Sequence, residues 1–321
     1  MRTSLSRWLP LVIVVGLAWL AMSHTQDIKD WLALRDYTPS AAIAGLADDS
    51  GMSDAGRRLF YVSHPELNDR DAFNTNCPFP DRSLVLGCYA QQQIYIFNVD
   101  DPRLSGVEEV TAAHEMLHAV YDRMSEGERA TIDRLVMDAY KELDDERLNE
   151  TIAQYEASDP SSVPNELHSI LGTEHRKLPQ ELEAHYAKFF ANNRKQVLDI
   201  SEAYEEVFVE LQDEIEGYDK QITNLKSQIT SLESSLETRS QALSREGDRL
   251  DALLAADDIS AYNAAVPAYN ADVASFNATI KEYQAKVKQH NDLVEKRNKI
   301  AVEQNDLVHS LDSKFSPIVN D

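Results

Sequence analysis

The sequence predicts a mainly helical α+β protein whose C-terminal third is a long antiparallel coiled-coil hairpin. From Phe208 to Leu250 apolar residues recur with alternating steps of three and four, which is the spacing of a coiled-coil seam. Two short segments between residues 83 and 99 have the composition of β-strands, so we expect few strands. The chain is then expected to contain an N-terminal apolar segment in residues 1–26, a compact domain in residues 27–200 and the hairpin in residues 201–321.

The composition limits the classes of partner. The 321 residues include 31 Lys and Arg against 55 Asp and Glu, which gives a formal net charge of −24. Such a surface repels phosphate backbones, so nucleic acid is not an expected partner. A hydrophobic content of 43% is enough for a substantial core. Proteins or peptides are the expected partners.

The N-terminal segment has the pattern of a membrane anchor. An apolar run of 15 residues, Trp8 to Met22, follows Arg2 and Arg7 and precedes Asp27. This charge order places the N-terminus in the cytoplasm and the rest of the chain outside. The run is shorter than the ~20 residues of a comfortable span, but the residues around Met22 make a poor cleavage site. We interpret residues 1–26 as a single-pass transmembrane signal anchor, with the remainder periplasmic or extracellular. The alternative is secretion after cleavage.

Cys77 and Cys88 are the only two cysteines. In an exported chain, an isolated pair eleven residues apart predicts a disulfide that closes the intervening loop. Two buried free thiols are the alternative. Without further cysteines or a nearby histidine the pair makes a poor metal site.

The compact domain is expected to combine short helices with two strands. Ser125 and Glu128 form a capping box that predicts a helix to about residue 144, and Pro160 and Pro164 mark a break before a new helix. The other expected elements are helices over residues 28–35, from about 40 to 45, 53–64 and 146–157, irregular structure over 66–83, and strands over 83–89 and 93–99.

The chemical centre of the sequence is the run Thr-Ala-Ala-His-Glu-Met-Leu-His-Ala-Val-Tyr in residues 111–121, which contains no proline or glycine. On a helix, His114 and His118 lie one turn apart on one face, so both imidazoles can reach one metal ion. Glu115 lies beside that ion and can take a proton from a bound water whose pKa Zn²⁺ lowers to about 7. The run therefore predicts a zinc site for hydrolysis of a peptide bond. The alternative is an amphipathic helix whose histidines are ordinary core or surface residues.

This H-E-x-x-H run resembles the zincin superfamily of zinc metallopeptidases, and it implies a small zincin-like domain. The segment Asn-Glu-Leu-His-Ser in residues 165–169 is similar to the Asn-Glu-x-x-Ser segment that supplies the glutamate ligand in thermolysin-like gluzincins. The resemblance implies that Glu166 is the third zinc ligand. The family has an aspartate after the serine where this chain has Ile170, so the contact that this aspartate makes must come from elsewhere. The family also implies that the strand over residues 93–99 pairs with an extended substrate.

A catalytic zinc needs a third protein ligand, and without the resemblance the sequence offers several candidates for it. Glu174, His168 and His175 lie near Glu166 in the sequence, and residues 178–190 hold further acidic side chains. From the same segment, His185 or Tyr186 can be interpreted as a donor to the oxyanion of a tetrahedral intermediate, or as simply packed or exposed.

The second arm of the hairpin repeats the seam and adds a column of amides. Val266, Tyr269, Val273 and Phe276 begin the seam. Asparagines recur every seven residues beside it, at Asn263, Asn270, Asn277, Asn291, Asn298 and Asn305, with Gln284 in the remaining position. We interpret the hairpin as a spacer or a homodimer rod. A docking surface for a coiled-coil partner is the alternative.

These patterns predict a membrane-anchored, extracytoplasmic zinc endopeptidase in which Glu115 is the general base. A non-catalytic envelope scaffold that acts through its hairpin is the alternative from another class, and in that case Glu115 has no role. Hydrolysis of a non-peptide bond such as a cell-wall amide stays open.

Overall fold

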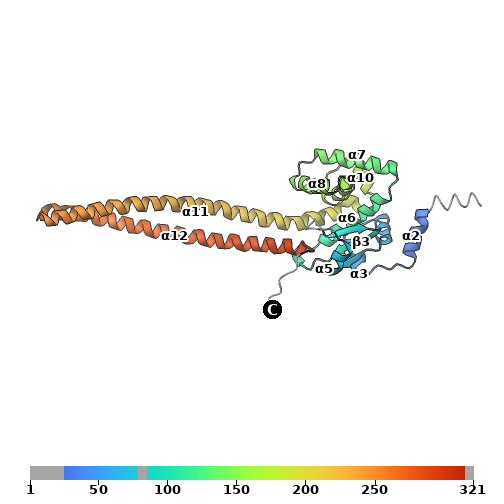
Figure 1. Cartoon of the computed structure of the whole chain (residues 1–321), viewed down its shortest axis with the longest axis horizontal. Coiled ribbons are helices and arrows are strands. Elements are labelled where there is room, and N and C mark those ends of the chain that lie inside the picture. Colours follow the sequence, from blue (N-terminus) through green and yellow to red (C-terminus); the bar gives the residue numbers. More distant parts are fainter. Residues whose placement is uncertain (1–24, 79–84, 315–321) are drawn as a thin grey trace, which may run out of the picture. The chain divides into compact units, whose positions relative to one another are not determined.

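A computed structural model describes residues 25–78 and 85–314 of the chain (Figure 1). The protein is mainly helical, with one small three-stranded sheet and a long helix, α11 (Lys195–Ala255). The predicted mainly helical class with few strands is confirmed. The described residues separate into two compact units. One contains the residues up to Glu206 together with those from Val308 onward, and the other is Val207–Leu307.

The N-terminal part of the first unit contains four short helices, and in three of them a side chain caps the first turn. They are α2 (Thr25–Arg35), α3 (Ala41–Asp49), α4 (Asp54–Val62) and α5 (Arg70–Asn76). Ser53 accepts a hydrogen bond from the backbone N–H of Gly56, as the predicted helix start requires. The irregular structure expected over residues 66–83 is wrong for its first part, which forms β1 (Glu66–Asn68) and α5. These elements have three and seven residues, which are too few to show the hydrophobic period of a strand or a helix in the sequence.

The sheet has the order β1-β3-β2, with β2 (Gly87–Ala90) antiparallel and β1 parallel to the central strand β3 (Gln93–Phe97). Gln91 and Gln92 join β2 to β3, and both have positive φ, 52° and 66°. This is the geometry of a two-residue hairpin turn whose twist matches that of the strands. The two predicted strands are therefore present, and each is shorter than expected.

The predicted disulfide is present. Cys77 follows α5 and is bonded to Cys88 in β2. Both sulfurs lie in a small apolar cluster with Phe73 and Phe97. The bond therefore fastens the edge strand β2 to α5.

Helix α6 (Val107–Asp122) is the centre of the first unit. It packs against α3, α4, β2 and β3, and also against α9 (Val163–Glu174). Gly106 precedes it with a φ of 101°, and a side chain there would collide with Ile200. Around α6 and α9 lie α7 (Glu126–Glu142), α8 (Glu146–Ser158) and α10 (Gln180–Tyr186).

The helix boundaries in this region follow the sequence closely. The capping box between Ser125 and Glu128 opens α7 as predicted. Helix α9 begins at Val163, before the expected start, because Pro164 lies in its first turn, where a proline removes no hydrogen bond.

The second unit consists of two long helices that run side by side in opposite directions, as the heptads predict (Figure 1). They are the parts of α11 and of α12 (Ile259–Leu311) that lie within residues 207–307, with Ile215, Leu225 and Leu250 buried in the seam. Side chains bond across the pair between Gln212 and Gln304, Asp219 and Arg297, and Glu233 and Tyr283. The partners in each pair are equally far from Asp258 along the chain, which is the register of a symmetric hairpin.

The expected N-terminal anchor lies almost wholly outside the described residues. Within residues 25–78 and 85–314, no helix combines the length and the apolar character that crossing a membrane requires.

Candidate metal centre

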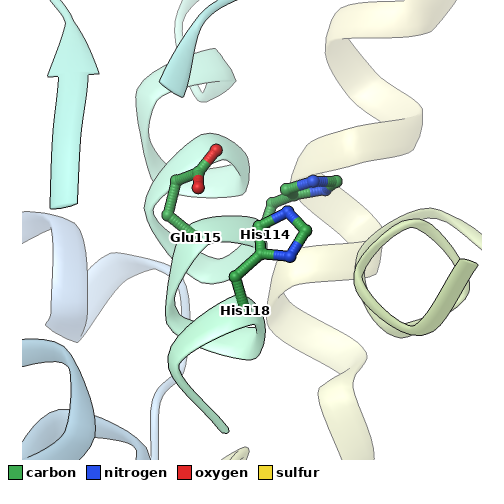
Figure 2. Close-up of side chains that lie close together, drawn as sticks. All are labelled: His114, Glu115 and His118. Carbon is green, nitrogen blue, oxygen red and sulfur yellow. The ribbon is translucent and has the colours of Figure 1, made fainter. Parts of the chain in front are cut away.

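Helix α6 presents the three residues of the H-E-x-x-H run together. His114 and His118 project from the same side, with ring centroids 4.8 Å apart, and Glu115 leaves the helix from a neighbouring side (Figure 2). One possible ligand atom from each residue lies within 4.8 Å of the others. Glu115 and His118 are buried. Among the described residues this is a group that could hold a metal ion.

Helix α9 adds a carboxylate to this group. Glu166 Oε2 lies 3.8 Å from His114 Nε2 and 3.7 Å from His118 Nε2. The oxygen is buried and has no hydrogen-bond partner among the described residues. With metal–ligand bonds of about 2.0–2.1 Å, tetrahedral ligand atoms lie about 3.4 Å apart. The two distances from Glu166 Oε2 exceed this value by a few tenths of an ångström, and a cation bound between these atoms would supply the partner that Oε2 lacks.

The ionisation of these groups suits a cation. Burial acts to raise the pKa of Glu166, but hydrogen bonds and the charges of the two imidazoles outweigh burial and lower the pKa to about 2, so the carboxylate is ionised. Tyr155 of α8 contributes one of those hydrogen bonds. Burial lowers the pKa of His118, which favours its neutral, ligating form. For His114 burial acts in the same direction, but Glu166 and Glu115 outweigh it and raise the pKa.

Two side chains of α9 orient His118. Its Nδ1 lies 3.0 Å from Asn165 Oδ1 and 3.3 Å from Ser169 Oγ. A hydrogen bond at Nδ1 fixes the tautomer and turns Nε2 toward Glu166. Asn165 and Ser169 therefore provide a supporting contact to this imidazole that the apolar side chain of Ile170 cannot make.

Gly172 allows α9 to approach α6. A Cβ at this position would lie 2.3 Å from Leu117 Cδ1 and 2.8 Å from the Tyr186 ring. No real side chain tolerates such a distance, so the close packing that brings Glu166 to the histidines depends on this glycine.

Arg194 closes the C-terminal end of α9. Its side chain is fully buried and donates to the carbonyl oxygens of Leu171, Gly172 and His175, and also to Glu183. Asn192, Asn193 and Arg194 all have positive φ, so this turn is left-handed. No local pattern in the sequence predicts this role for Arg194. The preceding Asn-Asn pair indicates only a left-handed turn, because asparagine tolerates a positive φ.

Glu115 faces strand β2, which lies at the edge of the sheet. Burial raises its pKa to about 8, and its Oε2 has no hydrogen-bond partner among the described residues. A Cβ on Gly87 of β2 would lie 2.6 Å from Glu115 Oε1 and 2.6 Å from Thr111 Cγ2. The backbone of β2 can lie against Glu115 only because residue 87 has no side chain.

The strand beside Glu115 is therefore β2 and not the strand over residues 93–99. The expectation that the strand over residues 93–99 pairs with an extended substrate is wrong, and the reason is the strand order. Strand β3 pairs with β1 on one side and with β2 on the other, so it has no open edge. Within the described residues β2 pairs with β3 alone.

The rival third ligands have other partners. Glu174 accepts a hydrogen bond of 3.0 Å from Arg147, which also binds Glu205. His168 is fully buried, and its Nε2 lies 2.9 Å from that of His185.

The suggested oxyanion donors are also engaged. Tyr186 donates its hydroxyl to the carbonyl oxygen of His168 at 2.7 Å, and it is fully buried. His185 is paired with His168. The Tyr186 hydroxyl is therefore not free to donate to a substrate in this conformation.

Comparisons with known proteins found no family model, no curated protein and no solved structure that matches this chain.

Proposed function

We propose that this protein is a membrane-anchored zinc endopeptidase of the gluzincin type, with its site outside the cytoplasm. His114, His118 and Glu166 would bind Zn²⁺. The observation that carries the proposal is the position of Glu166 Oε2, which is buried without a hydrogen-bond partner and lies within 4 Å of both Nε2 atoms.

When bound, Zn²⁺ supplies a Lewis acid that polarises the substrate carbonyl and acidifies water. Glu115 then moves the proton. One of its carboxylate oxygens accepts a proton from the attacking water and delivers it to the nitrogen of the peptide bond as that bond breaks. Burial alone raises the pKa of Glu115 to about 8, so the positive charge of a bound Zn²⁺ would be needed to keep the carboxylate ionised and able to accept the proton.

Strand β2 offers the substrate a backbone to pair with. Phe97 donates its backbone N–H to Leu86 O, and along an antiparallel pair the bonded residues alternate. The backbone groups of Gly87 and Tyr89 therefore point away from β3, toward the side of β2 on which no described strand pairs. An extended peptide added there would lie beside Glu115 and would be recognised largely through its main chain, as an endopeptidase requires.

Metal content is the first test. Purified full-length protein is expected to hold one zinc per chain by mass spectrometry of the native protein. Glu166→Gln should weaken zinc binding by at least about 100-fold, because it removes a ligand rather than a supporting contact. Glu174→Gln is the matched control and should leave binding unchanged. Protein without stoichiometric zinc would contradict the proposal.

Cleavage is the second test. Glu115→Gln should keep zinc and lose peptide hydrolysis by roughly 10²–10⁴-fold, the contribution of a general base. Full proteolysis by this variant would overturn the assignment of Glu115.

The alternative function is an envelope scaffold that acts through the hairpin. The observation in its favour is that all six asparagines of the heptad column are exposed along α12, so a second patterned surface lies outside the seam. This function predicts that Glu115→Gln has no phenotype in cells, whereas deletion of residues 208–307 abolishes function. The peptidase predicts that Glu115→Gln alone does so.

A further inference from the structure

Helix α2 has an exposed apolar face. Ile28, Trp31 and Leu32 have exposed fractions of 46%, 59% and 52%. Steps of three and four place them on one side of the helix, and the guanidinium of Arg35 lies over the Trp31 ring on the same side. Single exposed apolar residues are common, but three adjacent ones that include a tryptophan form a patch.

The opposite face of α2 is fixed to the first unit. Asp30 is buried and accepts a hydrogen bond of 2.9 Å from Gln26. Its carboxylate lies 3.8 Å from Arg123 Nη2 and 4.0 Å from Arg58 Nη2. Arg123 is the residue that ends α6, and it also donates to Ala119 O. The orientation of α2 is therefore tied to the end of the helix that carries His114 and His118.

The chain before α2 indicates what covers its apolar face. The apolar run Trp8–Met22 ends six residues before Ile28, and six residues reach at most about 20 Å. If that run lies in a membrane, α2 must lie at the surface of the same membrane. We propose that Ile28, Trp31 and Leu32 insert into the interface of a lipid bilayer and fix the orientation of the metal centre to it. This inference rests on the membrane localisation proposed above.

The chemistry of the face fits this occupant better than a protein. Tryptophan prefers the level of the lipid headgroups, and the guanidinium of Arg35, which pairs with Asp36 at 2.6 Å, lies on the same face. An interfacial helix buries its apolar side about 5–10 Å deep, which three side chains can do. A stable protein interface needs roughly 800 Å² from each partner, more than this patch offers. Arg123 lies only five residues beyond His118, about 8 Å along α6, so the contact would hold the site close to the bilayer.

Tryptophan fluorescence tests the proposal. The chain has three tryptophans, Trp8, Trp19 and Trp31, so the full-length variant W8F/W19F retains Trp31 alone. It is reconstituted into phosphatidylcholine vesicles, with and without bromine on the upper acyl chain. Brominated lipid should quench about half or more of the emission, while acrylamide in the water quenches little. The control is W8F/W19F/W31F/V302W, because Val302 has an exposed fraction of 60%, close to that of Trp31. It should be quenched by acrylamide and not by bromine.

Trp31 emission that is open to acrylamide and unaffected by bromine overturns the proposal. Protection from both quenchers also overturns it, because that result means that protein covers the face.

A second measurement avoids changes in the N-terminal run. Leu32→Cys carries a nitroxide label in the otherwise unchanged chain, and its collisions with dissolved oxygen should exceed those with a water-soluble nickel complex. The reverse ratio overturns the proposal.

Zinc content and peptide cleavage are measured on the same vesicles, so the two proposals can fail separately. Trp31 in lipid without bound zinc supports the membrane contact and contradicts the peptidase. Trp31 in water with one zinc bound contradicts the membrane contact and supports the peptidase.

Discussion

The metal centre and the hairpin are both built from helices, but their structures depend on different kinds of contact. In the hairpin the bonds between Gln212 and Gln304, Asp219 and Arg297, and Glu233 and Tyr283 repeat one rule, with partners equally far from Asp258. In the metal centre the decisive contacts join single residues that are far apart in the chain, such as His118 and Asn165, which are 47 residues apart. One substitution should therefore change the hairpin little and the centre strongly.

The largest expected effect is at Arg194. Arg194→Met leaves three carbonyl oxygens and Glu183 without their donor, and loss of one partner from such a buried group costs about 3–5 kcal/mol. Hydrogen exchange measured by mass spectrometry should show this as lost protection in α9 and α6. Arg297→Met is the control in the hairpin, where loss of the exposed pair with Asp219 should cost less than about 1 kcal/mol. Equal effects would remove the distinction between the two regions.

A smaller effect is expected at Gly172. Gly172→Ala forces Leu117 and Tyr186 apart and should cost about 1–3 kcal/mol, with weaker zinc binding as α9 moves. In the hairpin, Gly217 has nothing within 4 Å of an added Cβ. Gly217→Ala should stabilise α11 by roughly 0.5–1 kcal/mol, because alanine is the better helix former. Urea unfolding followed by hydrogen exchange checks both changes, and a stabilising Gly172→Ala would contradict the close packing described above.

The smallest predicted effect concerns pH. Burial lowers the pKa of His185 from 6.5 to about 4, so the unfolded chain takes up a proton before the folded one as pH falls. Stability from this group is complete above pH 6.5 and is lost as the pH falls through about 4. At pH 5 the loss is roughly 1–2 kcal/mol. Thermal unfolding between pH 7 and 5 should show it, and His185→Gln should flatten the slope. An unchanged slope would place the pH dependence in other groups.

The regular parts of the fold could be predicted from the sequence. The heptads of α11 and α12, the capping box at Ser125 and the helix that carries His114 all follow from local spacing. The disulfide followed from the number of cysteines and the expected compartment. In each case the residues that decide the structure lie close together or repeat.

The supporting parts of the site could not be predicted, because they depend on packing between distant segments. Nothing local indicates that Arg194 would end α9, that Gly87 would lie against Glu115, or that Tyr155 would bond Glu166. The strand expected to receive the substrate was wrong for the same reason. Strand order is set by pairing with β1, which is too short to be seen in the sequence.

The symmetric register of the hairpin has a consequence for how its length can change. The first unit is formed by chain segments on both sides of the hairpin, and Asn74 bonds the backbone of Ser313, just after α12 ends. The hairpin is thus an insertion into the first unit: the chain leaves that unit to form the hairpin and returns to it afterwards. Because partners are equally far from Asp258, seven residues added to one arm require seven added to the other. A rod of this design can lengthen or shorten in matched pairs of heptads, while the segments of the metal centre need no change at all.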